Sequence, residues 1–144
     1  MCMMVYLVAR TPLRMVPWLE AAPAFNTSTP APDEERVRRH FQWPDVVYAG
    51  SHEGCACGFQ LDPSARASLD SEEVRLREHS LRGFAEYLRE EVARVGSIEL
   101  FACWDGDQEA SPEHRRVLTP SALEQSDFLF MEKELSTVNM DAAG

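Results

Sequence analysis

The residues best suited to chemistry lie in one short stretch, residues 50–59. It reads Gly-Ser-His-Glu-Gly-Cys-Ala-Cys-Gly-Phe and holds two of the four cysteines and one of the four histidines of the chain. Thiolates and imidazoles are preferred zinc ligands, and thiolates are also nucleophiles and redox groups. The turn from Gly50 to Gly58 is therefore the candidate site, although its pattern matches no motif with an assigned mechanism.

The two cysteines of this stretch, Cys55 and Cys57, are separated by one residue. Both thiols would point to the same side of an extended segment. Structural zinc sites use spacers of about two to four residues and a second cysteine pair, which this spacing does not provide. Three alternatives stay open: an open site for zinc or another divalent metal, a redox pair, and a tight glycine turn whose cysteines are only small residues.

The polar residues next to the cysteines are candidates for a catalytic role. In a turn, His52 could act as a base that Glu53 orients, while Cys55 supplies a thiolate. These three residues form the candidate catalytic set. The alternative is a polar turn that faces solvent, as most loops do.

A second candidate segment is the turn formed by Asp105, Gly106 and Asp107. Two aspartates could supply hard oxygen ligands to a divalent cation. Asp-Gly is also among the commonest turn dipeptides, so a purely structural turn is the alternative. The candidate metal ligands are His52, Cys55, Cys57, Asp105 and Asp107.

The elements that would position these residues follow from the apolar pattern. Apolar runs predict strands at residues 3–9, 46–49, 98–104 and 128–135, the last near an edge of the sheet. Residues 70–95 carry an apolar stripe at helical spacing and end at Gly96, which predicts one long helix. Shorter helices are expected from Pro32 to about Trp43 and from Thr119. The alternation indicates a single α/β domain over residues 1–138, with a mixed or mostly parallel sheet of four or five strands.

The remaining segments are predicted to be irregular. Residues 11–32 contain five prolines and are expected to form a long covering loop or a lid. Residues 62–69 would connect the candidate turn to the long helix, and residues 108–117 would form a polar loop. Residues 139–144 are expected to be a flexible tail.

The predicted topology decides which residues meet. If strands 46–49 and 98–104 are parallel, their carboxyl ends share one edge of the sheet, where open α/β sheets bind ligands. That arrangement brings the candidate turn toward Asp105. Cys2 begins the first strand and is expected at the opposite edge, so it is left out of the site. Cys2 and Cys103 are both interpreted as small buried hydrophobic residues.

Composition limits the partners of this protein. The chain has 144 residues, a net charge of −10 and one lysine. Nucleic-acid binding is not expected, because phosphates need clustered Lys and Arg. No apolar window reaches the roughly 20 residues of a membrane span. The few cysteines and the lack of a recognisable signal segment favour a reduced, cytoplasmic protein.

The segment Gly-Ser-His-Glu-Gly-Cys-x-Cys-Gly-Phe, with the later Cys-Trp-Asp-Gly-Asp, resembles a set of small uncharacterised bacterial proteins. The resemblance implies a bacterial, cytoplasmic context and no particular activity. The sequence favours two hypotheses for the function of the protein. The first is a small metal- or thiol-dependent protein that acts on a small molecule or a metal at the candidate turn. The second is a non-catalytic acidic module, such as an inhibitor or immunity-like protein, that binds a basic protein partner.

Overall fold

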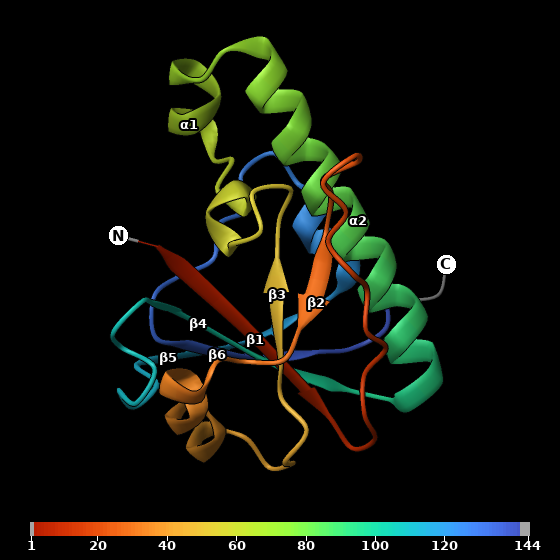
Figure 1. The fold of residues 1–144 in the computed structure, drawn as a ribbon, viewed down its shortest axis with the longest axis vertical. Coiled ribbons are helices and arrows are strands. Elements are labelled where there is room, and N and C mark those ends of the chain that lie inside the picture. Colours follow the sequence, from red (N-terminus) through yellow and green to blue (C-terminus); the bar gives the residue numbers. More distant parts are fainter. Residues whose placement is uncertain (1, 142–144) are drawn as a thin grey trace.

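A six-stranded sheet forms the centre of the structure, a computed structural model that describes residues 2–141 (Figure 1). The strand order is β2-β3-β1-β4-β6-β5. Four of the five strand pairs are antiparallel, and only β5 and β6 are parallel. The strands are β1 (Met3–Ala9), β2 (Asn26–Ser28), β3 (Val47–Gly50), β4 (Ile98–Trp104), β5 (His114–Leu118) and β6 (Glu134–Val138).

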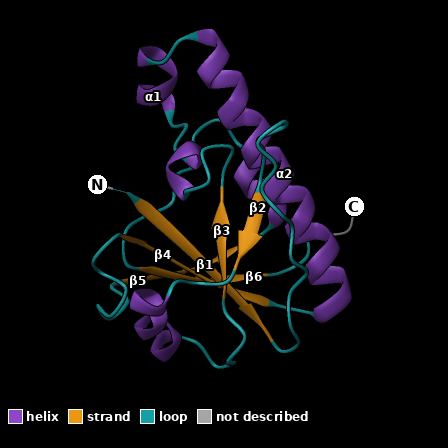
Figure 2. Ribbon diagram, in the orientation of Figure 1, coloured by secondary structure: helices purple, strands orange, loops and turns teal. Residues whose placement is uncertain are grey.

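Helices cover both faces of this sheet (Figure 2). The long helix α2 (Ser71–Val95) packs on one face together with two short 3₁₀ helices, η2 (Ala56–Phe59) and η3 (Pro120–Glu124). A third 3₁₀ helix, η1 (Pro32–His40), contributes Val37 to the core of the other face. The short helix α1 (Pro63–Ser68) precedes α2.

Strand β1 is central because its side chains are apolar on both faces. Val5 and Leu7 belong to the core under α2, whereas Tyr6 and Val8 belong to the core under η1. β1 pairs antiparallel with β3 on one side and with β4 on the other. The carboxyl ends of β3 and β4 therefore lie at the same end of the sheet as the amino end of β1. This direction of β1 determines which residues surround the candidate turn.

Helix α2 forms where the long apolar stripe predicted it. The Asp70 side chain accepts a hydrogen bond from the Glu73 amide at its start, and Gly96 ends it with a φ of 90°. Phe84 is fully buried and its ring stacks on Phe25, with ring centroids 4.9 Å apart. Phe59, from η2, also packs on the Phe84 ring, and the centroids of these two rings are 5.0 Å apart. The helix thus connects the sheet core directly to the segment that carries the cysteines.

Several predictions about the sheet were wrong. It has six strands rather than four or five, because β2 and β5 lie in segments expected to be irregular. Both are polar strands: β2 is short, and β5 is a largely exposed edge strand, so neither carries an apolar signal. The last strand starts at Glu134 rather than Phe128. Phe128 and Phe130 are instead buried in irregular backbone, which explains their apolar character.

The proline-rich segment before β2 is held against α2. The Tyr87 hydroxyl donates a hydrogen bond to the Arg14 carbonyl at 2.8 Å. The Glu91 carboxylate, almost fully buried, accepts a hydrogen bond from the Arg14 amide and pairs with Arg94. Trp18 contacts the candidate turn by donating its indole N–H to the His52 carbonyl at 3.0 Å. These contacts hold the segment against α2 and the candidate turn.

The end of the described chain also makes specific contacts. Asn139 donates its amide to the Leu118 carbonyl, and the Asp141 carboxylate accepts from the Ser121 amide. The remainder of the expected tail, residues 142–144, lies outside the described residues. Among the residues described, no helix combines the length and the apolar character needed to cross a membrane.

The aromatic core gives a direct test of this packing. Phe84→Ala should lower the free energy of unfolding by about 3–5 kcal/mol, because it leaves a cavity between α2 and the sheet. Chemical denaturation measures this value. Leu19→Ala is the control, since Leu19 is 57% exposed and its loss should change stability by less than about 0.5 kcal/mol. A similar small effect for both variants would contradict the packing.

The buried Glu91 predicts a specific sensitivity to acid. The Arg94 guanidinium lowers the pKa of Glu91; burial opposes this, and the Arg14 amide lowers the pKa further, so the net shift is downward. A depressed pKa stabilises the fold above the unfolded value of about 4.3, and this contribution disappears as pH falls through the folded value. Glu91→Gln should therefore flatten the loss of stability below about pH 5. The exposed neighbour Glu90→Gln should keep the wild-type slope, and equal slopes for both variants would refute the assignment.

Candidate metal centre

The candidate turn follows β3 and leads directly into η2 (Figure 1). Its centre is Ser51, which is fully buried. The Ser51 hydroxyl donates to the Cys55 carbonyl at 2.6 Å and accepts from the amides of Glu53 and Gly58, each at 3.2 Å. The Ser51 amide also donates to the Cys55 carbonyl, at 2.9 Å. One side chain therefore holds both halves of the turn together.

Two glycines permit this close folding. A Cβ on Gly58 would lie 2.3 Å from the Ser51 hydroxyl oxygen, and a Cβ on Gly50 would lie 2.5 Å from the Gly54 carbonyl oxygen. Neither approach is possible for a larger residue without movement of the turn. Close packing thus explains Gly58 and Gly50, whereas Gly54 adopts a φ of 87° that favours glycine.

The turn presents two cysteines beside a third. The Tyr48 hydroxyl accepts a hydrogen bond from the amide of Ala56, which lies between Cys55 and Cys57. The Sγ atoms of Cys2, Cys55 and Cys57 all lie within 4.8 Å of one another. All three are free thiols. Zinc–sulfur bonds are about 2.3 Å long, so sulfurs this close can share one ion.

The participation of Cys2 corrects the prediction that it lies at the opposite edge. That prediction assumed a parallel first strand, but β1 runs antiparallel to both β3 and β4. Its amino end therefore meets their carboxyl ends, and the Cys2 carbonyl accepts a hydrogen bond from the Asp105 amide at 2.7 Å. Cys2 is also exposed rather than buried, whereas Cys103 is buried as expected.

The protonation of the Cys57 thiol depends on its surroundings. Burial raises the pKa of Cys57 to about 11; the Met3 amide opposes this shift, and the neighbouring thiols of Cys55 and Cys2 add to it. Three thiolates packed together without a cation would repel one another. A bound metal ion would supply the missing positive charge and displace the thiol protons.

His52 does not join the cysteines. It is buried, and its Nδ1 lies 2.9 Å from the Ser80 hydroxyl while its Nε2 lies 3.3 Å from a Glu73 carboxylate oxygen. This order of serine, histidine and carboxylate resembles a hydrolytic triad. However, Ser80 is fully buried on α2, and its oxygen also accepts from the His52 amide at 2.9 Å. The hydroxyl has no access to substrate, so the arrangement anchors the turn to α2.

Glu53 and Glu73 form a second group of possible ligands with His52. The Arg77 guanidinium already lies among them, 2.9 Å from Glu73 and 3.9 Å from Glu53. Burial raises the pKa of Glu73, but Arg77 and His52 outweigh burial and leave it below its usual range. The positive charge that a metal would supply is therefore provided by arginine.

The carboxylates of the two aspartates in the second candidate segment do not join either group of ligand atoms among the described residues. The Asp105 carboxylate accepts a hydrogen bond from the Gln108 side chain at 2.8 Å. The Asp107 amide donates to the Trp104 carbonyl at 3.0 Å, and Gly106 between them has a φ of 106°. In the part of the chain that the structure describes, neither aspartate belongs to a cluster of ligand atoms with the cysteines or with His52. Their geometry is that of a structural turn.

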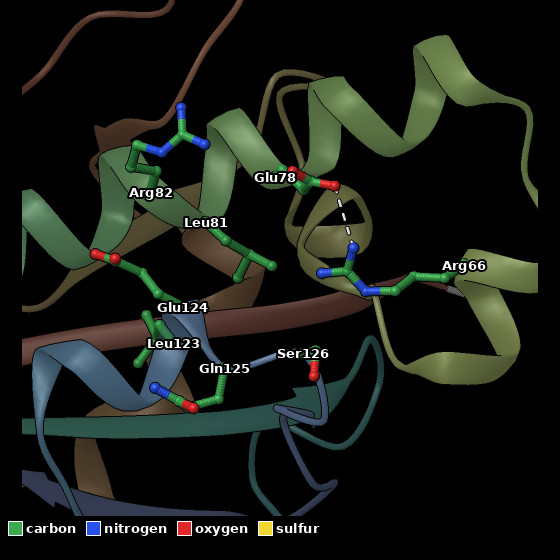
Figure 3. Close-up of a pocket in the computed structure, with 8 residues that line it drawn as sticks. All are labelled: Arg66, Glu78, Leu81, Arg82, Leu123, Glu124, Gln125 and Ser126. Atoms are coloured by element: carbon green, nitrogen blue, oxygen red, sulfur yellow. Dashed lines mark hydrogen bonds and ion pairs between the residues drawn. The ribbon is translucent and has the colours of Figure 1, made fainter.

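A separate cavity of about 200 Å³ lies between α1, α2 and η3 (Figure 3). An ion pair between Arg66 and Glu78, 3.1 Å apart, spans one side of it. Its lining contains no cysteine or histidine and does not include the candidate turn. The thiol cluster, meaning Cys2, Cys55 and Cys57, is therefore the site with distinctive chemistry.

No known family model, no curated protein sequence and no solved structure matches this chain. Its function must therefore be inferred from the site itself.

The role of Ser51 can be tested by removing its hydroxyl. Ser51→Ala leaves the buried Gly58 amide without its acceptor and should lower the free energy of unfolding by about 1–3 kcal/mol. Ser64→Ala, at an exposed position of α1, is the matched control and should stay within about 0.5 kcal/mol of wild type. If thermal or chemical denaturation shows no difference between the two variants, Ser51 does not hold the turn.

Proposed function

We propose that this protein binds a single thiophilic metal ion through Cys2, Cys55 and Cys57. The observation that supports the proposal is the convergence of three free thiols from two distant parts of the chain, with their sulfur atoms within 4.8 Å of one another. Soft thiolate ligands favour ions such as zinc and copper(I) over magnesium or calcium. The site is a metal centre made of sulfur, in place of the mixed set of histidine, cysteine and aspartate predicted from the sequence.

The surroundings favour binding or transfer of the ion over catalysis at a histidine. His52 is buried and is engaged by Ser80 and Glu73. Cys2 is exposed, and Cys55 and Cys57 are partly exposed, so the ion could be exchanged with another thiol ligand in solution. Free thiols also require a reducing compartment, and the cytoplasm meets this requirement.

Zinc titration tests the proposal. Reduced protein purified without a histidine tag should bind one equivalent of Zn²⁺, and Cys57→Ser should weaken binding by at least about 100-fold, since removing a direct ligand exceeds the effect of an outer-shell partner. A chromogenic chelator gives the affinity by competition. The control is Cys103→Ala, which removes a buried thiol outside the cluster and should leave the affinity unchanged.

A redox function predicts a different result in the same experiment. Oxidation of two thiols to a disulfide needs no metal, so the thiols of a redox protein would react readily with a mild oxidant, and the oxidised protein would bind no zinc. Absence of binding in wild type, or equal binding when all three cysteines are serine, would refute a metal centre at the thiol cluster.

A further inference from the structure

We propose that the thiol cluster is selective for copper(I), held by three sulfurs without an oxygen or nitrogen ligand from the protein. The inference rests on the proposed function and names the class of ion for that same site. It follows from which donors surround the three sulfurs and from how the other possible donors are already engaged.

The cluster has three donors and no ready fourth. Among residues 2–141, no further histidine, cysteine, aspartate or glutamate places a ligand atom within 4.8 Å of all three sulfurs. His52 uses both ring nitrogens in contacts with Ser80 and Glu73. Asp105, which approaches Cys2 through its backbone, has its carboxylate engaged by Gln108.

A set of three sulfur donors suits copper(I) better than zinc. Zinc in protein sites is almost always tetrahedral, and three protein ligands leave it with a water in the fourth position. Copper(I) is the softer ion, favours thiolate ligands and is satisfied by a trigonal set of them. A site with three sulfurs therefore completes the coordination of copper(I) but leaves zinc dependent on another donor.

Glu53 places a carboxylate oxygen close to the cluster. One of its carboxylate oxygens lies 4.0 Å from the Cys55 sulfur, while the other lies 3.9 Å from both His52 and Arg77. A side-chain rotation would allow Glu53 to complete a zinc site, whereas a hard carboxylate adds little for copper(I). Glu53 is thus the residue whose removal should affect the two ions differently.

Binding requires no change in oxidation state. Copper enters and stays as Cu⁺, no electron is transferred, and each thiol that binds releases its proton to solvent. The exposure of Cys2 leaves one side of the ion open, so an incoming thiolate could attack it and receive it.

The test is an anaerobic competition with reduced full-length protein. Copper(I) is supplied with bathocuproine disulfonate, a chromogenic chelator, and Zn²⁺ is added in excess. One equivalent of copper(I) should be retained, with an affinity at least about 100-fold above that for zinc. Glu53→Gln should weaken zinc binding by about 10-fold or more and leave copper(I) affinity within about 2-fold.

The outcomes separate this inference from the proposed function. If zinc displaces copper(I), the selectivity is refuted; if Glu53→Gln weakens both ions equally, the all-sulfur ligand set for copper(I) is refuted. In either case the thiol metal centre stands. If neither ion binds, the metal centre itself is refuted. Cys2→Ser must lower copper(I) affinity in the same assay, because retention of wild-type affinity would contradict a three-sulfur site. Cys103→Ala serves as the matched control for loss of a thiol elsewhere.

Discussion

The site depends on the hydrogen bonds made by the Ser51 hydroxyl. This hydroxyl is buried, it donates to the Cys55 carbonyl, and it accepts from the amides that lie before and after the two cysteines. Each such bond contributes only about 0.5–1.5 kcal/mol, but a buried amide left without a partner costs more. The same hydroxyl also excludes a side chain at Gly58. The turn can therefore adopt one compact shape, and that shape places Cys55 and Cys57 on the side facing Cys2.

The direction of β1 brings Cys2, the third cysteine of the site, to the candidate turn. Because β1 runs antiparallel to its two neighbours, the beginning of the chain lies beside the ends of β3 and β4. The hydrogen bond from the Asp105 amide to the Cys2 carbonyl extends this pairing by one residue. Asp105 thus contributes to the site by positioning Cys2 through its backbone, while its carboxylate bonds to Gln108. His52 has a comparable supporting role, because its contacts with Ser80 and Glu73 connect the turn to α2.

Much of the fold could be predicted from the apolar pattern, and the exceptions have physical reasons. β1, β4 and α2 were located accurately because burial on one or two faces leaves a strong periodic signal. β2 and β5 are polar strands, and the buried Phe128 and Phe130 imitate a strand in irregular backbone. The candidate turn was identified from its residue types, but its third cysteine was missed. Whether Cys2 meets Cys55 depends on strand direction, which composition and periodicity do not encode.

The central claim is that one ion contacts the sulfur atoms of Cys2, Cys55 and Cys57. X-ray absorption at the metal edge, on protein loaded with one equivalent of ion, counts those sulfurs directly. The structure predicts three sulfur neighbours at about 2.2–2.3 Å in wild type and two in Cys2→Ser. A sulfur count that is the same in both proteins would contradict the account, because Cys2 would then contribute nothing to the site.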